Sequence, residues 1–148
     1  MTGSKIARIA ALLTTGLLLA ATAWGASNNR SLFKYVAGTA TLQKGCSGKL
    51  EVTNSALVFQ CGQQSITAPY KTITEMSFMP RVSKRIRKMK LDWTVKPSAS
   101  HSRHQGFFTV LYSEKGRQRA LILKVRNETM RPYMAEIDLK TRLPIKTR

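Results

Sequence analysis

Acidic side chains are scarce in this chain. Its 148 residues contain 7 Asp and Glu against 25 Lys and Arg, so the formal net charge at pH 7 is +18. Histidine and cysteine are equally rare, with two of each, and the sequence has no Gly-rich phosphate loop, nucleophile elbow or paired-carboxylate motif. We therefore expect a non-catalytic protein without a metal or cofactor. The hydrophobic fraction of 43% is ordinary, so the chain should fold, and its length suits one small domain.

The two histidines, His101 and His104, lie in a Ser-rich stretch. A metal site needs at least one more ligand, and no acidic residue clusters with them along the chain. We interpret both as solvated loop side chains. An enzyme of the cell envelope is the weakest hypothesis, because it would need a pocket that unites one histidine with a carboxylate.

The first 25 residues have the pattern of a secretory signal peptide. Lys5 and Arg8 precede an uncharged stretch from Ile9 to Ala23, and small residues follow it. The alternative is an uncleaved membrane anchor, because the stretch up to Ala26 is just long enough to cross a bilayer. Both alternatives predict that the remainder is exported, either periplasmic or secreted. We expect residues 26–34 to be a flexible lead-in and residues 35–148 to form the domain.

Both cysteines, Cys46 and Cys61, fall in the part expected to be exported, where disulfides form and persist. Two β-favouring runs lie between them and meet at Thr53-Asn54-Ser55, which predicts a hairpin. A two-residue loop at Thr53-Asn54 places the cysteines directly opposite each other, and a longer loop makes them diagonal neighbours. No Cys-x-x-Cys spacing points to redox catalysis, so we predict a structural disulfide.

Hydrophobic alternation and turn residues predict about seven short strands. The candidate stretches, eight in all, lie on both sides of the Thr53-Asn54-Ser55 turn and at Tyr35–Leu42, Gln64–Tyr70, Ile73–Met79, Lys88–Lys96, Phe107–Ser113 and Arg119–Arg126. In the stretch from Lys88 to Lys96, the apolar side chains Met89, Leu91, Trp93 and Val95 should share one face.

The last segment has helical spacing instead. One apolar stripe is formed by Met130, Tyr133, Met134 and Ile137. We take Thr129 as the N-cap, because Pro132 then lies in the first turn, where proline is tolerated. Pro144 marks the expected end.

This order of elements resembles the pleckstrin-homology superfold, including its bacterial PH-like and GRAM-like relatives. The local pattern that carries the resemblance is Gly48-Lys49-Leu50, Ala56-Leu57-Val58-Phe59, Ile66-Thr67-Ala68-Pro69-Tyr70 and Ile73-Thr74-Glu75-Met76. The resemblance implies an α+β, mainly β fold, a bent antiparallel barrel of about seven strands with one C-terminal amphipathic helix. Members of the superfold bind lipids or peptides through basic residues near the loop between the first two strands. Here that loop contains Lys44 and Lys49 but also Cys46, and an exported protein would not meet phosphoinositides, so the resemblance implies a fold rather than a ligand.

The densest positive charge lies in the stretch RVSKRIRKMK. It contains six cations in ten residues, namely Arg81, Lys84, Arg85, Arg87, Lys88 and Lys90. Such a run is either a solvated face or an anion-binding patch. Our first hypothesis is an exported binding module whose basic face docks on an anionic envelope surface or an acidic protein. The alternative is a nucleic-acid-binding protein, because the charge suits it equally and two Trp and five Phe permit base stacking.

Overall fold

The fold of this protein is mostly β. The computed structural model describes residues 33–148. Eight strands and two α-helices follow one another as β1 (Phe33–Gly38), β2 (Ser47–Val52), β3 (Ala56–Cys61), β4 (Gln64–Pro69), β5 (Ile73–Met79), α1 (Lys84–Arg87), β6 (Gln105–Glu114), β7 (Arg117–Arg126), α2 (Asn127–Thr141) and β8 (Ile145–Lys146). A short 3-10 helix, Tyr70–Thr72, joins β4 to β5.

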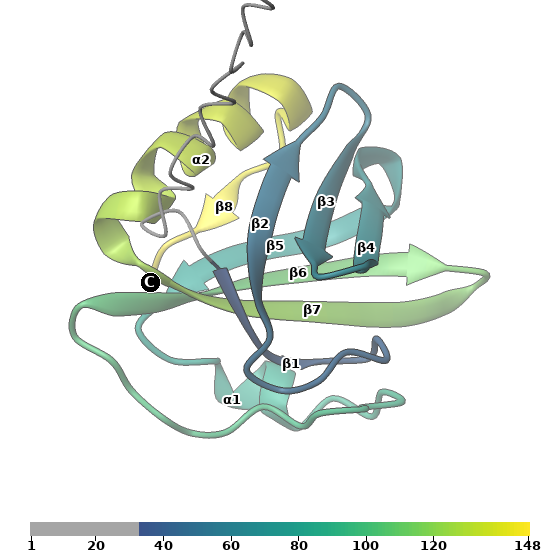
Figure 1. The fold of residues 1–148 in the computed structure, drawn as a ribbon, viewed down its shortest axis with the longest axis vertical. Helices are drawn as coiled ribbons and strands as arrows, with labels where there is room; N and C mark the ends of the chain where they lie inside the picture. Colours follow the sequence, from purple (N-terminus) through teal and green to yellow (C-terminus); the bar gives the residue numbers. More distant parts are fainter. Residues whose placement is uncertain (1–32) are drawn as a thin grey trace, which may run out of the picture.

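The strands form one sheet in the order β4-β3-β2-β1-β7-β6-β5-β8. Neighbours are antiparallel except β5 and β8, which are parallel. The sheet is bent, so that β2, β3 and β4 stand across the long strands β5, β6 and β7 (Figure 1). The main core fills the inside of this bend, and α2 lies over one end of it with Met130 and Ile137 fully buried.

The expected barrel is wrong, because the sheet is open. Its edges are β4 and β8, which lie at opposite ends of the strand order. Pro69 ends β4 without a backbone donor, and the 3-10 turn carries the chain away into β5. The remaining expectation of a mainly β sheet with a C-terminal helix is confirmed.

The first hairpin exists, but its turn lies one residue further along than predicted. The Thr53 amide donates to the Ala56 carbonyl oxygen at 3.0 Å, and the Thr53 hydroxyl accepts from the Ala56 amide at 3.0 Å. The loop is therefore Asn54-Ser55, and the Thr53 side chain fixes it. With this register Gln60 faces Lys49, so the cysteines are not direct partners.

The Cys46–Cys61 disulfide is nevertheless formed, with 6.2 Å between the two Cα atoms. Cys46 lies just before β2 and is tied to β1 instead, because its carbonyl oxygen accepts from the Tyr35 amide at 2.8 Å. The bridge therefore links the β1–β2 connection to the end of β3. A disulfide of this kind is typical of an oxidising compartment.

Strands β6 and β7 form the second predicted hairpin. Both are apolar on nearly every residue, from Gly106 to Tyr112 and from Ala120 to Leu123, and these residues are buried. Continuous burial means that both faces of this part of the sheet are covered. The main core covers the inner face, and a second, smaller cluster covers the outer face.

The C-terminal helix has the predicted apolar stripe but not the predicted start. Helix α2 begins at Asn127, with Arg126 rather than Thr129 as the N-cap residue, so Pro132 lies inside it. The Asn127 amide donates to the His104 carbonyl oxygen at 3.2 Å, which satisfies the first free N–H of the earlier start. The helix ends at Thr141 and Arg142 adopts the left-handed conformation, two residues before Pro144.

The expected leader, residues 1–25, lies outside the described residues, as do residues 26–32 of the lead-in. Strand β1 begins at Phe33, two residues before the predicted start at Tyr35, because Phe33 already pairs with Gly48 of β2. Within residues 33–148, no helix is long and apolar enough to cross a membrane.

Candidate anion-binding face

The six predicted cations lie in the connection between β5 and β6. We call residues 81–96 the basic segment. It lies below β5, β6 and β7 in Figure 1, on the side opposite α2 and the β2–β4 strands. It starts with the single-turn helix α1, where the Ser83 hydroxyl accepts from the Ile86 amide at 3.2 Å and so caps the turn.

Apolar side chains hold the basic segment against the sheet. Val82 and Ile86 are 4% and 2% exposed and belong to the cluster on the outer face of the sheet. This cluster also contains Ala37 of β1, Phe107 of β6 and Ile122 of β7. The half-buried Met89 and Trp93 pack against it. The segment is therefore a built part of the domain rather than a loose basic loop.

The strand predicted at Lys88–Lys96 is wrong. The only ladder contact of this stretch is an isolated bridge between Val95 and Gly38, at the end of β1. The predicted faces are nevertheless confirmed, since Met89, Leu91, Trp93 and Val95 are half-buried and the residues between them are exposed. The chain runs extended across the outer face of a sheet, with no neighbouring strand edge along most of its length, so the alternation arises from packing and not from strand pairing.

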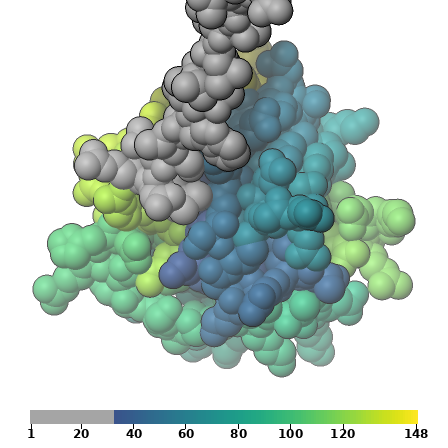
Figure 2. All heavy atoms as spheres, in the orientation of Figure 1, coloured from purple at the N-terminus to yellow at the C-terminus, as the bar shows by residue number. Residues whose placement is uncertain are grey.

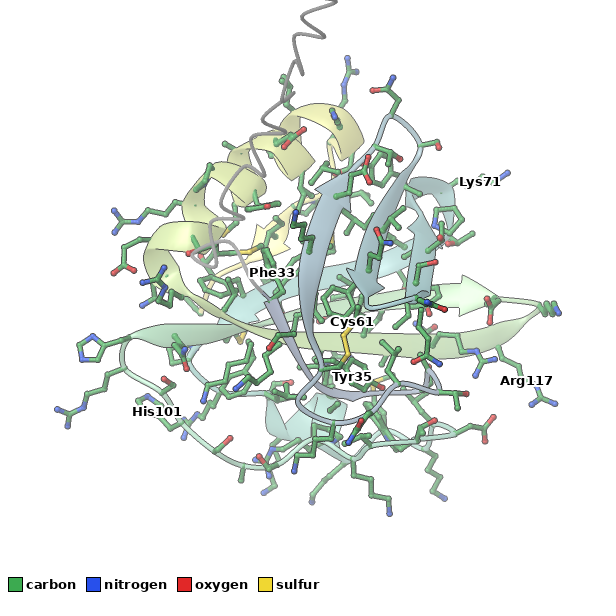
Figure 3. All side chains as sticks on the ribbon, viewed as in Figure 1. Phe33, Tyr35, Cys61, Lys71, His101 and Arg117 are labelled. Carbon is green, nitrogen blue, oxygen red and sulfur yellow. A yellow bond between two sulfur atoms is a disulfide. The ribbon has the colours of Figure 1, made fainter. Side chains whose placement is uncertain are left out.

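Four of the six predicted cations lie free on the solvent side. Arg81, Lys84, Lys88 and Lys90 are exposed, and among residues 33–148 no acidic side chain forms an ion pair with them. Basic side chains extend from the lower edge of the molecule in Figure 3, and Figure 2 shows this connection as the teal and green rim below β1.

Arg85 and Arg87 differ from the other four. The Arg85 guanidinium contacts both carboxylate oxygens of Glu75 at 2.5 and 2.6 Å, so Glu75 offsets its charge. Arg87 is half-buried, and its Nε donates to the Val82 carbonyl oxygen at 3.2 Å. The sequence pattern missed this division, because Glu75 lies ten residues away on β5.

Ion pairs further reduce the acidic charge that could oppose this face. Asp92 is the one acidic residue of the basic segment and lies 3.5 Å from the Arg117 guanidinium. Glu114 pairs with Arg119, and Glu136 with Lys140. These pairs are solvent-exposed and add little stability, and Asp92 remains the one acidic neighbour that the basic segment itself supplies to Lys88, Lys90 and Lys96.

A hollow of about 790 Å³ lies at the start of the basic segment. Its lining includes five basic side chains from separate parts of the chain, namely Arg81, Lys84, Arg87, His101 and Arg148. The density of charge along the sequence pointed to the first three, whereas we expected His101 to be a solvated loop residue. No local signal would have found Arg148, because only the parallel pairing of β8 with β5 brings the last residues to this place.

Exposed aromatic rings and a cluster of metal ligands are both absent from residues 33–148. All Tyr, Phe and Trp side chains in residues 33–148 are buried or half-buried, and the Trp93 indole donates to the Met89 carbonyl oxygen at 3.0 Å. The described surface therefore has no exposed aromatic platform for base stacking. In the same residues no three His, Cys, Asp or Glu side chains gather as metal ligands. His101 lines a hollow with cations and no carboxylate side chain.

The loop that the resemblance to pleckstrin-homology proteins singles out is built differently. Lys44 and Lys49 are exposed, but Gly45 donates to the Tyr35 carbonyl oxygen at 2.7 Å and Cys46 is bonded to Cys61. The β1–β2 connection is thus held against the domain at both positions. In comparisons with known proteins, neither a protein-family model nor a curated protein matches the chain.

Proposed function

We propose that this protein is an exported, non-catalytic binding module whose basic segment docks on an anionic envelope surface. One observation carries the proposal. Buried Val82 and Ile86 fix the basic segment to the sheet, so that Arg81, Lys84, Lys88 and Lys90 face solvent together on a rigid support. A merely solvated basic run would not need two fully buried anchors.

Export is supported by the leader pattern in residues 1–25 and by the disulfide. In that location, phosphate-rich lipid head groups and acidic polysaccharides are the polyanions that a strongly basic surface meets first. An acidic partner protein would suit the same charge. The order of seven antiparallel strands followed by α2 also supports the resemblance to the pleckstrin-homology superfold, although the sheet is open.

Sedimentation with anionic vesicles tests the docking face. The triple variant Lys88→Glu, Lys90→Glu, Lys96→Glu changes three exposed cations of the basic segment. Each cation near an anionic surface contributes about 1 kcal/mol, so we expect the affinity for phosphatidylglycerol vesicles to fall about a hundredfold at about 0.1 M salt. Thermal stability should stay unchanged, because none of the three side chains is buried.

The matched control carries the same change of charge elsewhere. Lys49→Glu, Lys71→Glu, Arg131→Glu alters exposed cations of β2, the 3-10 turn and α2, and Lys71 lies far from the basic segment in Figure 3. The control variant should lose only the long-range part of its attraction to the vesicle. At about 0.1 M salt this part is small, because charges more than about 10 Å apart are largely screened. Equal loss in both triple variants would refute the basic segment as the docking face and leave only net charge.

The compartment is tested separately. Mass spectrometry of the mature N-terminus in cell fractions should find a chain that begins after the leader, or an intact chain in the membrane fraction, outside the cytoplasm. A full-length, reduced chain in the cytoplasm would instead favour nucleic acid as the partner.

A further inference from the structure

The hollow beside α1 gathers basic groups from three distant parts of the chain. Arg81, Lys84 and Arg87 come from the start of the basic segment, His101 from the stretch before β6, and Arg148 from the end of the chain after β8. No Asp or Glu side chain lines it. Such a concentration of like charge raises the local potential and so attracts an anion into the space.

Several contacts hold the walls of this hollow in place. The Ser102 amide donates to the Pro80 carbonyl oxygen at 3.0 Å, which fixes the residue next to His101 against the start of the basic segment. The Arg87 Nε donates to the Val82 carbonyl oxygen at 3.2 Å. This bond orients the guanidinium group and leaves its other N–H groups for a ligand. Residues 147 and 148 follow β8, where Lys146 pairs with Ser77 of β5.

The acidic residue of the adjoining strand does not compete for these cations. Glu75 contacts Arg85 at 2.5 Å and Lys146 at 3.4 Å, and neither of these partners lines the hollow. The apolar floor, which includes Met79 and the buried Val82, would exclude water from one side of a bound anion and so strengthen its hydrogen bonds.

We infer that this hollow is a binding site for a phosphate monoester group. A monoester carries up to two negative charges and three terminal oxygens, whereas a diester carries one charge and two free oxygens. Three long basic side chains, an imidazole and Arg148 around one space match the larger charge and oxygen count. Arginine guanidinium groups bind such oxygens in a bidentate manner. The inference deepens the proposed function and rests on it for the source of the ligand, since a lipid head group or a soluble phosphate has the same chemistry.

Inorganic phosphate is the first probe, titrated at constant ionic strength into the isotopically labelled mature protein and followed by NMR. We expect shifts concentrated in residues 81–87, 101–103 and 147–148. The double variant Arg81→Gln, Lys84→Gln should bind phosphate about tenfold more weakly, because it loses two charge-assisted contacts. Both side chains are exposed and make no contact that folding needs.

The control Lys88→Gln, Lys90→Gln removes the same charge from the next part of the basic segment, outside the hollow. Its phosphate affinity should fall less than that of the Arg81→Gln, Lys84→Gln variant, because Lys88 and Lys90 do not line the hollow and act on an anion there only through the long-range field. Equal loss in the two double variants, or no localised shifts in the wild type, would overturn the site.

Vesicles then distinguish the two sources of phosphate. Phosphatidic acid vesicles present a monoester, and phosphatidylglycerol vesicles of equal surface charge present a diester. Preference for phosphatidic acid that the Arg81→Gln, Lys84→Gln variant loses assigns the hollow to a lipid head group. Equal binding of both vesicles, with the phosphate titration intact, assigns it to a soluble monoester. Phosphate binding that persists without any vesicle binding overturns envelope docking but supports the site.

Discussion

Removal of the disulfide should destabilise the domain by an amount that the structure fixes. The Cys46–Cys61 bridge closes a loop of 15 residues. On the chain-entropy estimate this loop contributes about 3 kcal/mol to the free energy of unfolding. For the 116 described residues, 1 kcal/mol corresponds to about 4 °C in Tm, so reduction should lower Tm by about 12 °C.

The native fold should survive the reduction, because backbone hydrogen bonds hold the same loop. Tyr35 donates to Cys46 at 2.8 Å, and Gly45 donates to Tyr35 at 2.7 Å. The bridge therefore acts mainly on the unfolded chain. The variant Cys46→Ala, Cys61→Ala should lose about 1 kcal/mol more than reduced wild type, since Cys61 is 5% exposed and packs in the main core.

The assay is urea unfolding followed by circular dichroism, on oxidised wild type, wild type in dithiothreitol and the double alanine variant. The oxidised protein should contain no titratable thiol, and the reduced protein two. A reduced protein with two thiols whose unfolding free energy falls by less than about 1 kcal/mol would refute the entropic account. Two titratable thiols in the protein purified from the exported fraction would show that the disulfide is not formed there.

Three further predictions concern the outer cluster, the buried tyrosine and the first hairpin. Ile86→Ala should lower the free energy of unfolding by about 2–4 kcal/mol, because Ile86 is buried in the outer cluster. Faster amide hydrogen exchange confined to residues 82–93 would show that the basic segment opens before the rest of the domain. Burial, with a smaller contribution from Tyr112, raises the pKa of Tyr35 to about 12, so between pH 10 and pH 12 only the unfolded chain loses this proton. Stability should therefore fall across that window by about 2–3 kcal/mol in urea melts, and Tyr35→Phe should flatten the fall. Gly48→Ala should lower the free energy of unfolding by about 2–3 kcal/mol in the same melts, because a Cβ at this position meets the backbone oxygen of Gln60. The control Ser47→Ala should change the free energy of unfolding little, because Ser47 is exposed.

The hairpins were predictable because their signals are local. Alternating apolar residues and a turn containing Asn identified β2 and β3, and Gly116 marked the turn between β6 and β7. The register was not predictable to the residue. It depends on the Thr53 hydroxyl, which accepts from the Ser55 and Ala56 amides and shifts the loop by one position.

The prediction of a barrel was wrong, and β8 was not predicted, for a different reason. Whether β4 meets another edge depends on the bend of the whole sheet, and whether β8 forms depends on where α2 delivers the chain. Neither property is encoded in a short window of sequence. Similarly, the alternation of apolar and polar residues from Met89 to Val95 indicates which side chains face the protein. It does not indicate whether they pack on the face of a sheet, as they do here, or belong to a strand paired at its edge.

The proposed docking face rests on the distribution of charge rather than on its total. A net charge of +18 attracts any polyanion and carries no information about which one. The structure divides the cations of the basic segment into Arg85, which Glu75 offsets, and exposed neighbours that no acid pairs with in the described chain. Because no aromatic side chain on this described surface is exposed, the free cations present charge without stacking. Such a surface can contact phosphate oxygens, which lipid head groups and nucleic-acid backbones both carry, but it offers no exposed ring for stacking bases, and the paired vesicle and phosphate titrations measure the phosphate contacts.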